Sequence, residues 1–386
     1  MSERSAIAIG EESCYPLGMT IGVPKEIKRH EYRVGLTPHD VRSYVAHGHR
    51  VVIQESAGVG SGYEDDEYRK YGAELVGSAA EVFQAADLII KVKEPLPEEF
   101  DLFHEGQILY TYLHLAANVP LAKALMERGV IAIAYETIEL PDGSLPCLTP
   151  MSEIAGRLSV QEGAKYLEKE FGGRGILLGG VPGVPRGSVA ILGGGIVGTN
   201  ACKIAVGIGA NVTILDINAR RLSYLDDIFG SSITTLYATD ANIEYVLGEA
   251  DIVIGAVLLP GESTPKLITR EHIKMMKPGA VLVDVAIDQG GIAETSKPTT
   301  HDEPIYIVDD VVHYCVANMP GAVARSSTIA LTSVTLSYGL LIADMGVKAA
   351  LASSEALRKG LNIVAGTCVH EKVARSCKLP FTEYAG

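Results

Sequence analysis

Residues 188–216 decide the fold, and they read SVAILGGGIVGTNACKIAVGIGANVTILD. The apolar run that ends at Leu192 predicts a buried parallel strand, and the apolar pattern that stops at Gly209 predicts a helix. A second predicted strand, residues 211–215, leads directly to Asp216. Strand, glycine-rich turn, helix, strand and acidic residue thus follow one another in the order that a dinucleotide-binding βαβ unit requires.

Three glycines in GxGxxG spacing form the turn of this unit. Gly193 permits the tight turn, Gly195 lets the backbone approach a pyrophosphate, and Gly198 lets the helix and the strand pack closely. The N-terminus of the helix offers unpaired N–H groups and the positive end of a dipole to the phosphates. We therefore expect a dinucleotide at this turn.

Asp216, which lies 18 residues after Gly198, indicates which dinucleotide is bound. Its carboxylate would accept hydrogen bonds from the adenosine ribose hydroxyls and would repel a 2′-phosphate, which favours NAD over NADP. Arg220 and Arg221 follow closely, so the use of NADP stays open. A structural βαβ turn without a ligand is the weaker alternative, because strand, helix and acid all stand where the motif requires them.

The composition is that of an ordinary globular chain. With 386 residues, of which 47% are hydrophobic and 21% charged, two domains are expected. A net charge of −14 argues against a nucleic-acid or anionic-membrane surface. The six cysteines are scattered without a CxxC pair, which argues against a zinc cluster or a disulfide framework and favours a reducing cytoplasm.

Alternating strands and helices predict an α/β chain with two Rossmann-like, doubly wound domains. Residues 148–324 form the predicted NAD-binding domain, which is inserted into a discontinuous substrate domain of residues 19–147 and 325–386. We expect the preceding extension, residues 1–18, to be poorly ordered.

Two helices near the domain junctions are also predicted from the sequence. A long helix is expected from about Ser152, its predicted cap, to Phe171. The uncharged stretch 326–343 is long enough to span a bilayer, but its many Ser and Thr residues favour a buried helix between the domains.

Several candidate chemical groups follow predicted strands, where ligands bind in parallel sheets. Lys93, His114 and Glu136 stand at such ends in the first domain, and Asp288 stands at one in the NAD-binding domain. Imidazole is a suitable proton carrier, and Arg33 has a planar fork that suits a carboxylate. Lys93 could polarise a keto oxygen, and Asp288 could activate water. Each also has an ordinary interpretation as a core residue, a surface charge or a turn cap.

A series of segments closely resembles bacterial L-alanine dehydrogenases in order and spacing: GVPKEIKRHEYRVGLTP, LIIKVKEP, YLHLAA, LPCLTPMSEIAGR, LGGGIVG, PGAVLVDVAIDQGG and YCVANMPGAV. The resemblance extends from Met19 to the FTE near the C-terminus. It implies reversible NAD-dependent oxidative deamination of L-alanine to pyruvate and ammonium, with hydride transfer to nicotinamide C4. It also implies a cytoplasmic homohexamer, and we expect no metal, nucleic-acid or membrane partner.

The same resemblance implies roles for individual residues. His114 and Asp288 match the catalytic pair of the family, and Arg33 and Lys93 match its pyruvate-binding cations. The family contacts the dinucleotide at positions that correspond to Ser152, Ile196, Val197, Asp216, Val257, Leu258, Asn318 and Met319. Arg221 stands where some relatives have lysine, and it joins Gly193, Gly195 and Gly198 among the expected cofactor-binding residues.

Three other functions are weighed against this one. The NAD-binding subunit of proton-translocating transhydrogenase resembles the chain but typically lacks the residues that stand here as His114, Lys93 and Asp288. A lysine-forming dehydrogenase of the saccharopine type would need a larger, more charged pocket, of which the sequence gives no sign. The same polar residues also argue against a non-catalytic NAD-responsive protein.

Overall fold

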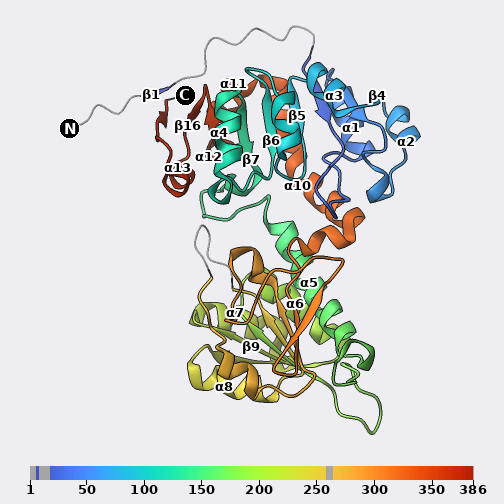
Figure 1. The fold of residues 1–386 in the computed structure, drawn as a ribbon, viewed down its shortest axis with the longest axis vertical. Coiled ribbons are helices and arrows are strands. Elements are labelled where there is room, and N and C mark those ends of the chain that lie inside the picture. Colours follow the sequence, from blue (N-terminus) through green and yellow to red (C-terminus); the bar gives the residue numbers. More distant parts are fainter. Residues whose placement is uncertain (1–5, 8–17, 258–263, 386) are drawn as a thin grey trace, which may run out of the picture. The chain divides into compact units, whose positions relative to one another are not determined.

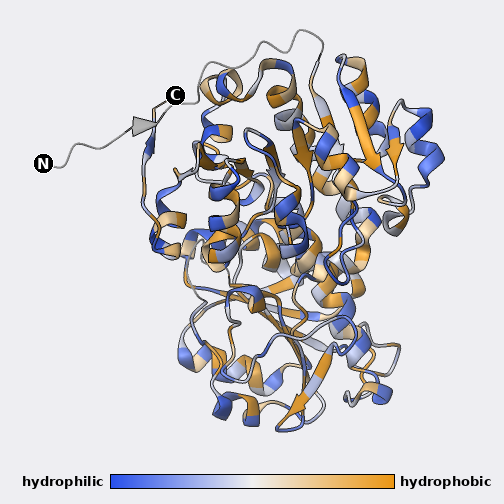
Figure 2. Cartoon of the chain, turned by 45° about the horizontal axis from the view of Figure 1, so that its top comes forward, coloured by the Kyte–Doolittle hydropathy of each residue, from blue (hydrophilic) through white to orange (hydrophobic). Residues whose placement is uncertain are grey.

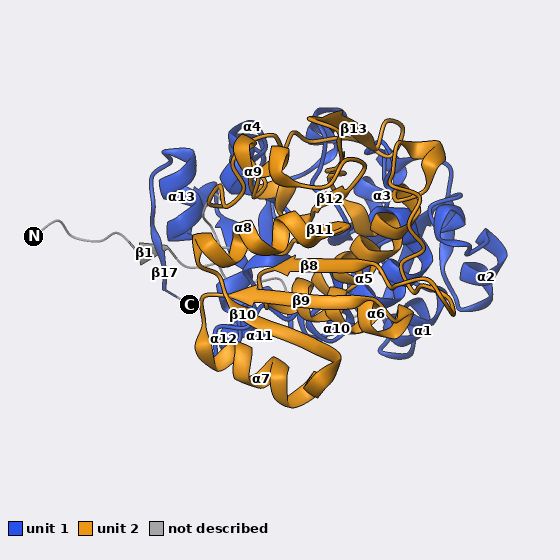
Figure 3. Ribbon diagram, turned by 90° about the horizontal axis from the view of Figure 1, so that it is seen from below, with its two compact units in different colours: residues 1–151, 321–386 blue, residues 152–320 orange. Residues whose placement is uncertain are grey.

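The computed structural model describes residues 6–7, 18–257 and 264–385. The chain divides into two compact units, which Figure 3 colours separately: unit 1 comprises residues 1–151 and 321–386, and unit 2 comprises residues 152–320. Each unit contains one large, mostly parallel sheet with helices packed on it (Figure 1). The predicted fold class is therefore confirmed.

The sheet of unit 1 has eight strands: β2 (Thr20–Val23), β3 (Arg50–Gln54), β4 (Glu74–Val76), β5 (Leu88–Ile90), β6 (Ile108–Thr111), β7 (Ile131–Ala134), β15 (Leu361–Val364) and β16 (Thr367–Cys368). Their spatial order is β16-β15-β7-β6-β5-β2-β3-β4. The strands from β2 to β7 run parallel, whereas β15 pairs antiparallel with β7 and with β16.

The helices of unit 1 are α1 (Pro38–Ala46), α2 (Asp65–Lys70), α3 (Ala79–Ala85), α4 (Val119–Glu127), α10 (Ala324–Met345), α11 (Val347–Ser353), α12 (Glu355–Gly360) and α13 (Glu371–Cys377). Short 3-10 turns η1 (Val59–Ser61), η2 (Pro97–Leu102), η3 (Leu115–Ala117) and η4 (Tyr135–Thr137) lie between them. The central strands are buried on both faces and are almost wholly apolar, as Figure 2 shows by their hydropathy.

Unit 2 contains the stretch that opened the sequence analysis. Its strands are β8 (Ser188–Leu192), β9 (Asn211–Asp216), β10 (Ile233–Tyr237), β11 (Ile252–Gly255), β12 (Val281–Asp284), β13 (Ile305–Val308) and β14 (Val311–Tyr314). Their order is β10-β9-β8-β11-β12-β14-β13, with only β13 antiparallel to its neighbour. The helices are α6 (Ile196–Ile208), α7 (Ala219–Phe229), α8 (Asp240–Glu249) and α9 (Arg270–Met275), while α5 (Thr149–Tyr166) contains the boundary between the units.

The two sheets share one topological feature that positions ligands. In each, the chain adds strands on one side of the first strand and then crosses to its other side, between β2 and β5 in unit 1 and between β8 and β11 in unit 2. Ligands of doubly wound sheets bind beyond the carboxyl ends of the strands at this switch point. Each unit therefore has one place where a ligand is expected.

Helix α10 contains the uncharged stretch 326–343, which the sequence predicted to be helical, and has Arg325 and Asp344 near its two ends. The segment Met319–Met345 is long and apolar enough to cross a membrane by length and composition, a criterion that core helices of globular proteins also meet. Within unit 1, the Tyr110 hydroxyl donates to the Thr335 carbonyl at 3.1 Å, and the hydroxyls of Ser61 and Thr328 lie 2.8 Å apart. These contacts are those of a core helix.

The predicted start and end of α5, Ser152 and Phe171, are both wrong. The helix begins at Thr149 and ends at Tyr166, so Ser152 lies inside the first turn and is not a cap. Pro150 is tolerated in this turn because the first N–H groups of a helix have no partner within it. Of the predicted extension, only residues 6–7 and 18 are described, and Ala6–Ile7 (β1) pairs in parallel with Glu383–Tyr384 (β17).

Candidate active site

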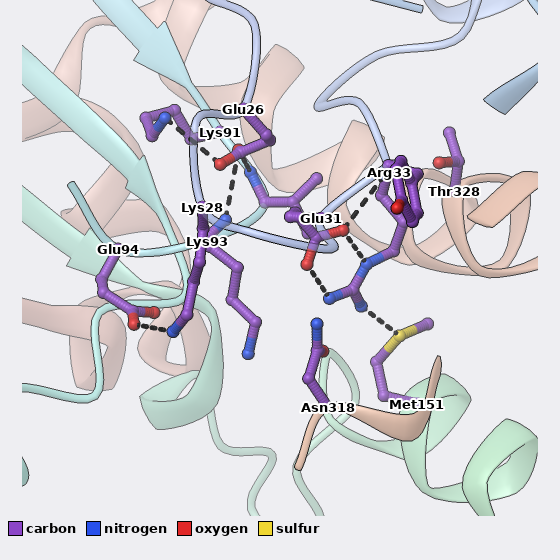
Figure 4. Close-up of polar contacts among 12 residues, drawn as sticks. Glu26, Lys28, Glu31, Arg33, Lys91, Lys93, Glu94, Met151, Asn318 and Thr328 are labelled. Atoms are coloured by element: carbon purple, nitrogen blue, oxygen red, sulfur yellow. Dashed lines mark hydrogen bonds and ion pairs between the residues drawn. The ribbon is translucent and has the colours of Figure 1, made fainter. Parts of the chain in front are cut away.

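The polar groups of unit 1 gather at the carboxyl ends of four neighbouring strands. Arg33 follows β2, Lys93 follows β5, His114 follows β6, and Glu136 follows β7, and these strands are adjacent in the sheet. In Figure 4 the side chains of Lys93 and Arg33 extend toward the same side of this edge. Three of these residues were predicted at strand ends from the sequence, and the structure places them there.

Arg33 is a buried cation with a fixed orientation. Its side chain is 2% exposed, and its Nε and one Nη each lie 2.6 Å from a different carboxylate oxygen of Glu31. The other Nη lies 3.1 Å from the sulfur of Met151. Burial opposes the charge, but the hydrogen bonds and charge of Glu31 outweigh it and raise the pKa of Arg33. The guanidinium therefore stays charged and cannot rotate freely.

Replacing Arg33 with methionine should destabilise the protein by about 3 kcal/mol, because it leaves the buried Glu31 carboxylate without its partner. Arg50 supplies a matched control: it pairs with Glu74 at 2.6 Å, but both side chains are 52% exposed. Arg50→Met should change stability by less than about 1 kcal/mol. Chemical denaturation measures both, and equal losses would contradict this account of Arg33.

His114 is held by its backbone and by its ring. Its φ of +49° lies in the left-handed region, which is strained for a residue with a side chain. The Glu136 carboxylate accepts from the His114 N–H at 2.6 Å and from the Leu113 N–H at 3.2 Å, which stabilises this conformation. The ring stacks on Tyr112 with a centroid distance of 5.8 Å, yet the side chain is 44% exposed. The imidazole is thus fixed but accessible.

Glu94 determines which nitrogen of His114 is available. Its carboxylate pairs with the Lys28 ammonium and lies 3.3 Å from His114 Nδ1. Although burial opposes its charge, the bonds to His114 and Lys28 hold the pKa of Glu94 far below its usual range. An ionised carboxylate only accepts hydrogen bonds, so Nδ1 carries the proton that it donates to Glu94. Nε2 is then the nitrogen that can exchange a proton with a ligand.

In unit 2 the glycine turn has the shape that a dinucleotide requires. Gly193 has a φ of +104°, and a Cβ at Gly198 would overlap the Gly193 carbonyl oxygen. By contrast, apart from Gly195 itself and its two chain neighbours, no described atom lies within 4 Å of the position of a Cβ at Gly195, the residue that caps α6. The backbone at Gly195 is therefore open for a phosphate, next to a helix N-terminus.

Asp216 and Arg221 both bind the glycine turn from outside it. The Asp216 carboxylate accepts from the Gly194 N–H at 2.6 Å and from the Asn218 N–H at 2.8 Å. The Arg221 guanidinium donates to the Gly194 carbonyl and, at 2.5 Å, to the Thr199 hydroxyl. With the open Gly195 and the helix N-terminus, this arrangement fits an adenine dinucleotide whose ribose meets Asp216.

Comparison with known proteins identifies the family. The family model "Alanine dehydrogenase/PNT, N-terminal domain" matches residues 22–155, and "Alanine dehydrogenase/PNT, C-terminal domain" matches residues 159–371. The alanine dehydrogenase of Methanococcus maripaludis is 58% identical over 94% of this chain and 98% of its own length. The chain belongs to the alanine dehydrogenase family. The alanine dehydrogenase of Bacillus subtilis is 57% identical over 92% of this chain and 94% of its own.

Solved structures agree with this family. A structure titled L-alanine dehydrogenase has a TM-score of 0.91 and 54% identity, and it covers 93% of this chain and 99% of its own. A transhydrogenase from Sinorhizobium meliloti has a TM-score of 0.78 at 24% identity, covering 91% and 99% of the two chains. The second likeness shows a shared fold only.

Asp288 is the second catalytic residue that the sequence predicted for this member of the alanine dehydrogenase family. It lies in the short helix η7 (Val285–Gln289) after β12. Its side chain is exposed and makes no hydrogen bond or ion pair within the described part of the chain. The buried Asp284, which the sequence did not single out, holds this loop. Its carboxylate accepts from the Ile292 N–H at 2.8 Å and from the Ser296 hydroxyl at 2.5 Å, and burial raises its pKa.

The other predicted cofactor residues fall in unit 2. Ile196 and Val197 begin α6, Val257 follows β11, and Asn318 has a left-handed φ of +61° next to the buried Met319. Ser152 lies half-buried in α5, and Leu258 lies outside the described residues. Their role in binding stays a prediction. In the described ranges, no three His, Cys, Asp or Glu side chains are grouped as metal ligands would be.

Sequence reasoning also missed several charged residues of unit 1: Glu26, Lys28, Glu31, Lys91, Glu94 and Glu99. Lys91 and Glu94 lie within two residues of Lys93 in KVKEP, but nothing in a local pattern tells a buried lysine from one that faces a ligand. The segment KEIKRHEYR contains two glutamates and four lysine or arginine residues, and only the fold shows that Glu31 pairs with Arg33.

Proposed function

We propose that this protein catalyses the reversible NAD-dependent oxidative deamination of L-alanine to pyruvate and ammonium. One observation carries the proposal: His114, with an accessible ring fixed by Glu94, lies on the same sheet edge as the cations Arg33 and Lys93. A carboxylate substrate that must exchange a proton needs such a set. The membership in the alanine dehydrogenase family supports the choice of L-alanine.

Arg33 and Lys93 bind the carboxylate of alanine. Because Glu31 fixes the guanidinium of Arg33, the direction of its donors is set before the substrate arrives. Lys93 contributes a compact charge from the neighbouring strand end. Together these residues orient Cα of alanine for the loss of hydride.

Gly193, Gly195, Gly198 and Asp216 hold the dinucleotide in unit 2, with Arg221 bracing the turn. NAD⁺ supplies the hydride acceptor when it is bound. Once Cα is oxidised to the imine, His114 Nε2 takes a proton from the water that adds to Cα and gives a proton to the departing amine. Asp288 is the second proton-handling group. Overall, alanine, water and NAD⁺ give pyruvate, ammonium, NADH and one proton.

The test is an initial-rate assay with purified protein. We expect NADH from L-alanine and NAD⁺ without a membrane or a second nucleotide, and a lower rate with NADP⁺ because Asp216 repels the 2′-phosphate. Glycine, serine and 2-aminobutyrate, tested beside alanine, define the width of the pocket. Absence of NADH with every amino acid would overturn the proposal, and transfer of hydride between two nucleotides would favour a transhydrogenase.

The orientation of His114 by Glu94 predicts how a change at Glu94 affects the rate. Glu94→Gln keeps the length of the side chain but replaces the carboxylate that accepts from His114 Nδ1 with an amide that can also donate. The tautomer that leaves Nε2 able to take a proton is then no longer enforced, and kcat/KM for alanine should fall about tenfold.

Lys28→Met is the matched variant, because it removes the cation from the same carboxylate. The Glu94 carboxylate still accepts from His114 Nδ1, so kcat/KM for alanine should stay within about threefold of the wild type. Initial rates at saturating NAD⁺ measure both variants. Equal losses in the two variants would contradict the role of Glu94.

We further propose a cytoplasmic enzyme of alanine catabolism that assembles as a homohexamer, with NAD bound by unit 2 and alanine bound by unit 1. The resemblance to the family supports the hexamer. Light scattering that gave the mass of a single chain would overturn this assembly.

A further inference from the structure

Three charged side chains are buried together behind the sheet edge of unit 1. Glu26, Lys91 and Glu99 have side chains that are 3%, 1% and 3% exposed. The Lys91 ammonium lies 2.8 Å from an oxygen of Glu99 and 3.3 Å from Oε2 of Glu26. Apolar side chains of similar volume would often be as stable in such a place, so stability alone does not account for the cluster.

The remaining oxygens of the cluster bind the main chain on both sides of Lys93. Oε1 of Glu26 accepts from the Val92 N–H at 2.7 Å and from the Lys93 N–H at 3.2 Å, as Figure 4 shows in part. The other oxygen of Glu99 accepts from the Leu96 N–H at 3.0 Å. The segment that carries Lys93 is thus held at three amides by two buried carboxylates.

The position of Glu26 connects the two segments that carry the substrate-binding cations. It lies on the loop that leaves β2 and continues to Arg33, and it binds the residues that leave β5. β2 and β5 are the pair at the switch point of this sheet. A hydrogen bond across this point controls the distance between the two loops that flank a bound ligand.

We propose that Glu26 is a positioning residue for the reaction: through the amides of Val92 and Lys93 it sets the place of Lys93 relative to Arg33, and hence the fit of the substrate carboxylate. The Lys91 ammonium lies at the other oxygen of Glu26. The inference rests on the proposed function, in which Arg33 and Lys93 together bind the substrate carboxylate.

A carboxylate suits this role because both of its oxygens accept hydrogen bonds. One oxygen faces two N–H groups and the other faces an ammonium. A glutamine side chain has one accepting oxygen and one donating NH₂ group. If its oxygen faced the two main-chain amides, its NH₂ group would face the Lys91 ammonium, which is also a donor. Burial raises the pKa of Glu26, while Lys91 and the Val92 N–H oppose that rise. The accepting oxygen, rather than the charge, is what Val92 and Lys93 require.

Two triple variants isolate the accepting oxygen. Both carry Lys91→Met and Glu99→Gln, which make the rest of the cluster uncharged; one adds Glu26→Gln and the other adds Glu26→Met. Gln and Met have similar length and no charge, but only Gln accepts from the two amides. Glu98→Gln, an exposed change in the same loop, is the control for the KM assay.

We expect the Gln variant to keep its KM for pyruvate within about threefold of the wild type, whereas the Met variant should show a KM about tenfold higher at similar kcat. Hydrogen exchange should show faster exchange at Val92 and Lys93 in the Met variant only. Equal KM values for pyruvate in the two variants would overturn the proposal, and so would equal hydrogen exchange at Val92 and Lys93. A Met variant that lost thermal stability without a change in KM would also overturn it.

These readouts separate the inference from the proposed function. A wild-type protein that forms no NADH from alanine would overturn the proposed function, whatever the variants do. The exchange comparison needs no activity, so equal exchange at Val92 and Lys93 would overturn the positioning role of Glu26 even in an active enzyme.

Discussion

Replacing His114 with alanine is expected to lower kcat for alanine oxidation about a thousandfold, the usual contribution of a positioned acid–base group. In the proposed mechanism, Nε2 of this imidazole takes the proton of the attacking water, because Nδ1 donates its proton to Glu94. Removing the ring should leave the glycine turn of unit 2 unchanged. Stopped-flow or steady-state formation of NADH measures the loss.

The His114 variant needs two comparisons. Its Kd for NADH should stay within about twofold of the wild type, because the dinucleotide residues belong to unit 2. His104→Ala, at an exposed histidine of unit 1, should leave kcat unchanged. A His114→Ala enzyme that kept a tenth or more of the wild-type kcat would remove His114 from the mechanism.

Gly198→Val is expected to raise the Kd for NAD⁺ at least about a hundredfold, and to lower kcat/KM in proportion. A Cβ at this position would overlap the carbonyl oxygen of Gly193, a backbone atom that can move only if the whole turn moves. Because the Gly194 N–H and carbonyl hold Asp216 and Arg221, a displaced turn would also shift the Asp216 carboxylate, which we propose binds the ribose. Calorimetric titration with NAD⁺ measures the change.

Gly207→Val provides the matched control for this prediction. Gly207 lies in the same helix, α6, and no described atom lies within 4 Å of the position of its Cβ. Valine also has a higher helix propensity than glycine, so this variant should bind NAD⁺ normally and be at least as stable as the wild type. Equal losses of binding in both variants would show that the Gly198–Gly193 contact does not control the turn.

The NAD-binding unit was predictable from the sequence because its determinants are local. β8, the glycine turn, α6 and β9 are consecutive, and the structure has them at Ser188–Leu192, Ile196–Ile208 and Asn211–Asp216, as expected. The contact that requires a glycine at position 198 involves a residue only five positions away. The start of α5 was less predictable, because Thr149 and Ser152 are both good cap residues.

The substrate side could be predicted only in part. The position of Lys93, His114 and Glu136 after parallel strands follows from the alternating pattern, but their partners do not. Glu31 lies two positions before Arg33, but nothing in the sequence indicated that its carboxylate and the guanidinium form a bidentate pair. The hydrogen bond of the His114 N–H to Glu136 and that of the His114 ring to Glu94 do not follow from sequence spacing, because the partners come from different strand ends.

The sequence by itself therefore determined the α/β class and the glycine turn, since short-range periodicity and motif spacing encode these, and it predicted the residues that we propose bind a carboxylate and move a proton. Only the tertiary structure decided which charges are paired and which are accessible. Lys91 and Lys93 are two positions apart, yet the Lys91 ammonium is buried between Glu26 and Glu99, whereas Lys93 is partly exposed. The reason is physical: the state of a charge depends on neighbours that the fold brings from distant parts of the chain.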